Sequence, residues 1–242
     1  MARGNPNIFE GHKTFHLLTY NTFLIHMLIG ESPPYKSERV KGFLHQLNND
    51  ENQLDFVFFQ ELHRFGNVWF KLFDNSPYDE MLNGLIQKKI GQKLAFHVVE
   101  SKKPFPLCQD SGLVILSKYP VLKSENYIFK STTWRSYVTA KAFDENKRRL
   151  QIQELVQFIK ECIEPFLHTT EAPPRIIISG DFNIDSIREE MYNEMMNLLN
   201  TEIGLCQDVF GSKVSEHPTT FAGVLCLDHV IVSGNFKAQL KL

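Results

Sequence analysis

One short stretch, Arg175-Ile-Ile-Ile-Ser-Gly-Asp-Phe-Asn183, constrains the fold of this chain more than any other. Three consecutive β-branched residues favour a pleated, packed strand. The apolar run is short, follows a pair of prolines and closes on Ser-Gly, which is typical of a core strand. We therefore predict a buried strand from Ile176 to Ser179, with Asp181 and Asn183 directly beyond its end.

Asp181 and Asn183 allow two interpretations. Period-two alternation sends both side chains to the same side, where a carboxylate and an amide would form a polar reaction centre. Placing such groups in a core would be costly, because buried polar groups need partners. Alternatively, they cap a helix that begins near Ser186, since Asp, Asn and Ser are preferred N-cap residues. This stretch alone supports both interpretations equally.

Polar side chains lie at the ends of three more predicted strands. Two strands end in Asn21 and in Gln60-Glu61, and a third carries Asp228 at its start. Each residue alone has an ordinary explanation as a turn, a strand end or a cap. Together with Asp181 they would supply hard oxygen ligands, a set that suits Mg²⁺ and also Mn²⁺. A metal held by one or two carboxylates and a substrate phosphate implies phosphoester cleavage.

The order of the predicted elements favours an α+β fold in one domain over residues 1–242. Strands and helices are mixed rather than alternating, which favours mixed sheets covered by helices over a doubly wound sheet. The predicted strands are Phe15–Tyr20, Leu54–Glu61, Phe96–Glu100, Ser111–Ser117, Glu125–Phe129, Arg135–Phe143, Ile176–Ser179, Cys226–Ser233 and a last one near Phe236–Leu242. The predicted helices are Ser37–Leu47, Val68–Phe73, Glu80–Ile90, Lys147–Leu167 and Ser186–Leu199.

Composition argues against several other classes of protein. A formal net charge of −2 argues against a strongly basic surface for nonspecific nucleic-acid binding. Four widely spaced cysteines without a CxxC motif form neither a metal-binding pattern nor a disulfide scaffold. The sequence contains no transmembrane-length apolar run and no apolar signal-peptide core. We expect a cytoplasmic or peripheral membrane protein, or a secreted one if a signal peptide was removed.

Four motifs, in order along the chain, resemble the endonuclease/exonuclease/phosphatase (DNase I-like) superfamily. They are Leu-Leu-Thr-Tyr-Asn21, Phe-Phe-Gln-Glu61, Gly-Asp181-Phe-Asn183 and Leu-Asp228-His-Val. A Gly-Asp-x-Asn motif alone would be a weak signal, but four motifs in the family order are a strong one. The segment Asp110-Ser-Gly-Leu-Val-Ile-Leu-Ser-Lys-Tyr-Pro120 is further similar to the neutral sphingomyelinase and phospholipase C-type branch.

The resemblance implies a four-layer α/β/β/α sandwich, in which two mixed sheets face each other and helices lie outside. By resemblance, Glu61 ligates Mg²⁺, and Asn21 lies close to the metal and the phosphate. Asp181 would orient or deprotonate the attacking water, and Asn183 would donate to the phosphate oxygens as charge develops on them. Asp228 matches the aspartate that orients a catalytic histidine in the family.

The sequence departs from the family at two histidines. The family carries one in a Thr-His-Leu strand, but here Phe143 runs directly into Asp144 and the long helix. The family carries the other in a C-terminal Ser-Asp-His motif, but this sequence ends at Leu242 before one occurs. We expect the domain to lack the internal strand near 143–144 and its C-terminal end. Either segments are missing from this sequence alone, or the protein itself lacks them and is inactive or altered.

The remaining histidines are weak substitutes for these two. Alternation places His229 on the face opposite Asp228, so we expect it to point away from the site as a core or surface residue. His63 follows Glu61 and is a weaker candidate near the mouth of the site. His168 lies beyond the long helix, where a helix end favours positive charge.

Three functions follow from these motifs. The first is a Mg²⁺-dependent phosphodiesterase of the sphingomyelinase C kind, a monomer acting on a phospholipid headgroup at a membrane surface. The second is a nuclease or a phosphoinositide phosphatase, although a nuclease should show a basic groove. The third is a non-catalytic binding or regulatory protein that keeps the fold without the catalytic histidines.

Overall fold

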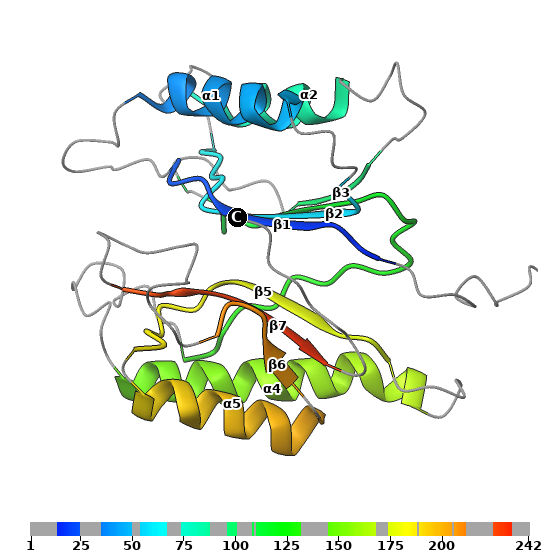
Figure 1. Ribbon diagram of the computed structural model, residues 1–242, viewed down its shortest axis with the longest axis vertical. Coiled ribbons are helices and arrows are strands. Elements are labelled where there is room, and N and C mark those ends of the chain that lie inside the picture. The colour runs from blue at the N-terminus through cyan, green and yellow to red at the C-terminus, as the bar shows by residue number, and fades with distance from the viewer. Residues whose placement is uncertain are drawn as a thin grey trace, which may run out of the picture. The chain divides into compact units, whose positions relative to one another are not determined.

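A computed structural model describes residues 14–24, 35–49, 54–66, 74–87, 96–100, 108, 110–131, 145–167, 174–187, 189–204, 206–211 and 225–233. The chain divides into two compact units, Met1–Ser124 and Glu125–Leu242, and each is described below by itself. Both are visible in Figure 1. The prediction of one domain over residues 1–242 stays a prediction.

The first unit contains a mixed four-stranded sheet in the order β1-β2-β4-β3. Its strands are β1 (Leu17–Asn21), β2 (Phe56–Gln60), β3 (His97–Glu100) and β4 (Val114–Ser117). β1 runs parallel to β2, and β4 is antiparallel to both β2 and β3. Because parallel strands end at the same edge, the carboxyl ends of β1 and β2 lie together, with Asn21 opposite Gln60.

Two helices, α1 (Lys36–Asn49) and α2 (Ser76–Gln87), cover one face of this sheet (Figure 1). Strand alternation explains the core beneath them, because Val57 and Phe59 of β2 point to the helices and are fully buried. Val114 and Leu116 do the same from β4, and Val40 and Met81 close the core from the helices.

The second unit contains an antiparallel sheet in the order β5-β7-β6, packed against helices α4 and α5 (Figure 1). Its elements are α4 (Glu145–Leu167), β5 (Ile177–Asp181), α5 (Glu189–Ile203), β6 (Cys206–Asp208) and β7 (Asp228–Ser233). The core joins Ile152 and Val156 of α4, Met195 and Leu199 of α5, and Ile231 of β7. No helix among the described residues is long and apolar enough to cross a membrane.

These elements confirm the α+β prediction, with two corrections. The strand predicted at Glu125–Phe129 is wrong, since 121–131 contain no strand. The Glu154 carboxylate accepts the N–H groups of Lys130 and Ser131 at 2.6 and 2.9 Å, so this segment is held by α4 instead. The short strand β6 is not predicted by the sequence.

Other boundaries differ by a few residues. α5 begins at Glu189 rather than Ser186, because the Ser186 N–H donates to Cys226 O and the Ile187 N–H to the Asp185 carboxylate. The predicted elements at Val68–Phe73, Arg135–Phe143 and Phe236–Leu242 lie outside the described residues.

Candidate functional site

In the first unit, the structure brings Asn21 and Glu61 together. Asn21 is the last residue of β1, and Glu61 follows the last residue of the parallel strand β2. Asn21 Nδ2 donates a hydrogen bond to Glu61 Oε1 at 3.1 Å, while Asn21 Oδ1 accepts the Phe23 N–H at 3.0 Å. Asn21 is therefore arranged to hold the glutamate, because its own oxygen is turned to the backbone.

The second carboxylate oxygen of Glu61 is the best candidate for a cation ligand. Glu61 Oε2 is buried and has no hydrogen-bond partner among the residues that the structure describes. The neighbouring Gln60 Oε1 is also buried without a hydrogen-bond partner among the described residues. Leaving a buried carboxylate oxygen unsatisfied is costly, and a cation would relieve that cost.

The donor set fits a hard divalent cation. Magnesium keeps several water ligands and needs only one or two protein carboxylates together with substrate oxygens. Within the described part of the chain, no three His, Cys, Asp or Glu side chains cluster as a metal site. Glu61 is thus the residue that would hold the ion, and Asn21 would orient the Glu61 carboxylate.

In the second unit, Asp181 and Asp228 lie opposite each other on the neighbouring strands β5 and β7. Asp181 ends β5 and Asp228 begins β7, and the two residues are direct partners in the antiparallel register. Side chains of directly opposite residues lie on the same face of a sheet. Burial raises the pKa of the Asp181 carboxyl and the Asp228 charge raises it further, whereas the Asn183 N–H, His229 and Arg148 oppose the rise. Asp181 is therefore better suited to accept a proton than an exposed aspartate.

Asn183 is exposed and lies just past this strand end. Its φ of 53° is in the left-handed region, so the period-two alternation that predicts its direction stops before it. Its N–H donates to Asp181 Oδ1 at 2.8 Å. The alternative prediction of a helix cap is wrong, because α5 begins only at Glu189.

His229 and His63 are held in structural contacts. His229 is fully buried, its Nδ1 lies 2.8 Å from Asp208 Oδ2, and its Nε2 lies 2.8 Å from Ile184 O. Both partners are acceptors, so both ring nitrogens carry protons and donate. This confirms that His229 is a core residue. His63 is also buried, with Nδ1 3.1 Å from the Asp110 carbonyl oxygen, and His168 lies outside the described residues.

Asp208→Asn is expected to lower the free energy of unfolding by about 2 kcal/mol at pH 6, because it removes a charged hydrogen-bond partner from His229. Burial lowers the pKa of His229, but the bond to Asp208, its charge and the Ile184 carbonyl outweigh this and raise it. The contribution is therefore complete below the ordinary histidine pKa and lost as the pH rises through the raised value. Urea unfolding at several pH values measures the difference, and a difference independent of pH would contradict this account.

Sequence reasoning missed several charged residues beside these sites. Arg148 acts on the Asp181 carboxylate electrostatically. Asp110 and Arg64, which is three residues past Glu61, form an ion pair with Asp110 Oδ2 3.1 Å from Arg64 Nε. One feature of the sequence could have indicated this ion pair. Asp110 stands directly before the Ser-Gly that precedes β4, and a buried aspartate needs a charged or hydrogen-bonding partner.

Two solved structures are similar in fold to this chain. SmcL matches with a TM-score of 0.55 and 14% identity, over 93% of this chain and 84% of that chain. An endonuclease/exonuclease/phosphatase family protein from Leptotrichia buccalis C-1013-b matches with a TM-score of 0.50 and 16% identity, over 93% and 89%. At this identity the matches show a shared fold, which is DNase I-like. No curated protein matches significantly.

The profile of the Endonuclease/Exonuclease/phosphatase family matches residues 18–240, which is almost the whole chain. The chain belongs to this family, whose members are phosphoesterases.

Proposed function

We propose that the chain is a Mg²⁺-dependent phosphodiesterase that hydrolyses a phospholipid headgroup, in the manner of a sphingomyelinase C. The observation that carries this proposal is the Asn21–Glu61 pair. One oxygen of Glu61 is held by Asn21, and the other is buried without a partner among the described residues. Such an oxygen suits a cation that in turn binds a phosphate.

In this proposal the fold is the four-layer α/β/β/α sandwich of the family. Asp181 takes the proton of the attacking water, which its raised pKa favours. The Asn183 side-chain amide donates to the phosphate oxygens as negative charge develops. Asp228 supplies the like charge that keeps the proton affinity of Asp181 high. A bound divalent cation would neutralise charge on the phosphate.

The substrate class rests on sequence. Residues Asp110 to Pro120 resemble neutral sphingomyelinases, and the net charge of −2 does not favour a polynucleotide. We therefore propose a substrate in a membrane surface, reached by a cytoplasmic or peripheral monomer.

A second candidate function is phospholipid binding without catalysis. The observation that favours it is His229, whose two ring nitrogens are both occupied by acceptors in the core. This histidine is not available as a general acid for the leaving group.

A panel of substrates tests the proposal with the purified chain and Mg²⁺. The panel comprises sphingomyelin vesicles, phosphoinositide vesicles and supercoiled plasmid DNA. We expect release of phosphocholine from sphingomyelin, abolished by EDTA, and no plasmid nicking. Vesicle binding without release would support the non-catalytic function, and nicking or phosphate release would favour the other branches of the family.

A further inference from the structure

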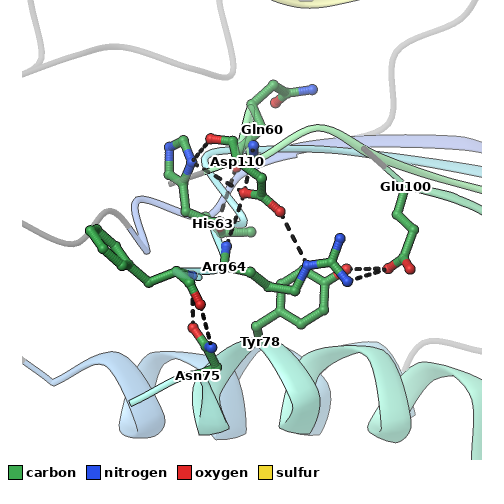
Figure 2. Close-up of polar contacts among 10 residues, drawn as sticks. Gln60, His63, Arg64, Asn75, Tyr78, Glu100 and Asp110 are labelled. Carbon is green, nitrogen blue, oxygen red and sulfur yellow. Dashed lines mark hydrogen bonds and ion pairs between the residues drawn. The ribbon is translucent and has the colours of Figure 1, made fainter. Parts of the chain in front are cut away.

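We propose that Asp110 is a positioning residue for Glu61, acting through the Arg64 guanidinium and the loop 61–66. The inference rests on the proposed role of Glu61 as a metal ligand. Figure 2 shows the polar contacts from which it is drawn.

The backbone of Glu61 needs support from outside its own strand. Its φ is 53°, in the left-handed region that non-glycine residues rarely adopt, and such strain persists only where the surroundings hold it. Within the described part of the chain, the Glu61 side chain accepts a single hydrogen bond, from Asn21 Nδ2 to Oε1. The direction of the unpartnered Oε2 therefore depends on where the loop places the backbone of residue 61.

The loop is bound along its length to Cys108, Asp110 and Gly112. The Leu62 N–H donates to Gly112 O at 2.9 Å, the Asp110 N–H to Arg64 O at 3.1 Å, and the Gly66 N–H to Cys108 O at 2.8 Å. Gly112 has a φ of 66°, and a Cβ there would lie 2.6 Å from His63 Nδ1, so the two segments fit closely. These contacts fix the loop that begins at Glu61 against the segment that carries Asp110.

Both carboxylate oxygens of Asp110 bind this pair of segments, and its side chain is 2% exposed. Oδ1 accepts the N–H groups of Arg64 and Gly112 at 2.9 and 3.1 Å, and Oδ2 accepts Arg64 Nε at 3.1 Å. Burial opposes ionisation of Asp110. His63, whose Nδ1 lies 3.7 Å from Oδ1, and the hydrogen bonds from Arg64 and Gly112 hold the pKa of Asp110 below its usual value. A carboxylate held by these donors fixes the position of residue 64, three residues past Glu61.

Arg64 also links the Asp110 carboxylate to β3 and to α2 (Figure 2). Its Nη1 lies 3.3 Å from Glu100 Oε2 at the end of β3, and its guanidinium carbon lies 4.7 Å from the Tyr78 ring centroid. The Tyr78 hydroxyl donates to the same Glu100 carboxylate. Asn75, beside α2, also bonds both backbone groups of Phe65 at 2.9 and 3.0 Å. The loop is therefore anchored beyond Glu61 at successive residues.

The test compares Asp110→Asn with Asp55→Asn in the full chain. Asp55 is a matched control, because it is also a buried carboxylate of this unit, bonded to the His16 N–H at 2.9 Å and to Lys118 Nζ at 3.2 Å. It precedes β2, at the opposite end of the strand from Glu61. Mn²⁺ alone is the probe, and its binding is followed by the electron paramagnetic resonance signal of the free ion.

We expect Asp110→Asn to weaken Mn²⁺ binding by about 10-fold, the lower end of what direct partners of metal ligands contribute, because it acts on Glu61 through the loop. Asp55→Asn should leave the binding unchanged. In a Glu61→Gln background, Asp110→Asn should have no further effect. Arg64→Gln keeps the backbone contacts and should weaken binding in the same direction, which covers the case that Asp110→Asn does not fold.

Equal losses from Asp110→Asn and Asp55→Asn would show a merely structural role and overturn the inference, as would unchanged binding in Asp110→Asn and Arg64→Gln. Either result leaves the proposed function standing. Wild-type protein that binds no Mn²⁺ through Glu61 would overturn the proposed metal site and this inference together.

Discussion

Asp181→Asn is expected to lower kcat for phosphodiester hydrolysis by about 10²–10⁴-fold, the usual contribution of a general base. Asparagine has the same size and can still accept the Asn183 N–H, which lies 2.8 Å from Asp181 Oδ1, but it cannot take a proton from water. The fold should therefore survive while the chemical step slows. Steady-state kinetics on vesicles, with circular dichroism as a check of folding, measures both.

Asp185→Asn is the matched control for this prediction. Asp185 is a buried carboxylate four residues further on, and its Oδ1 accepts the N–H groups of Ile187 and Cys226 at 3.2 and 3.1 Å. An asparagine amide oxygen can accept both bonds, so activity should be retained. Equal losses in the two variants would mean that Asp181 acts through local structure rather than as a base.

The pH dependence of the wild type follows from the same residue. Only ionised Asp181 can accept a proton, so kcat should fall as the pH is lowered through a pKa above the ordinary value of about 3.9. Asp228→Asn removes the like charge that raises this pKa. The acidic limb of the profile of kcat against pH should therefore move to lower pH. A limb that stays in place or moves to higher pH would contradict the assignment.

Glu61→Gln is expected to reduce Mn²⁺ affinity by more than the roughly 10–100-fold that outer-shell partners contribute, because it removes the charged ligand itself. The glutamine can still accept the Asn21 amide hydrogen bond, so the strand ends should stay in place. Activity at fixed Mg²⁺ should fall in parallel and recover in part at higher Mg²⁺.

Glu38→Gln is the control for Glu61→Gln, since Glu38 is an exposed acidic residue of α1 in the same unit. It should bind Mn²⁺ like the wild type. If Glu61→Gln also binds like the wild type, the ion is held elsewhere.

The sequence predicted the buried strands and missed what depends on distant contacts. β2 lies within the predicted strand Leu54–Glu61 because its apolar run requires burial on a sheet. The segment Glu125–Phe129 has a similar apolar pattern, but the Tyr127 ring packs 5.0 Å from the Phe158 ring of α4, and Glu154 accepts the backbone N–H groups that follow. No local pattern indicates such a helix contact.

The candidate site was predictable where strand geometry alone places the residues. Asn21 and Glu61 follow from the common edge of two parallel strands, and the opposition of Asp181 and Asp228 follows from strand ends that pair. The direction of Asn183 was not predictable, because alternation fails at a positive φ. The ion pair between Asp110 and Arg64 joins residues 46 positions apart, so it depends on the tertiary fold and no local pattern identifies the partner of Asp110.

Hydrolysis of sphingomyelin vesicles in ¹⁸O-labelled water is the most direct test of the central claim, that Glu61 and Asp181 support metal-dependent attack of water on phosphorus. The account predicts phosphocholine that carries the label, unlabelled ceramide, and loss of both products with EDTA or in Glu61→Gln. Label in the ceramide, or hydrolysis that persists without a divalent cation, would contradict it.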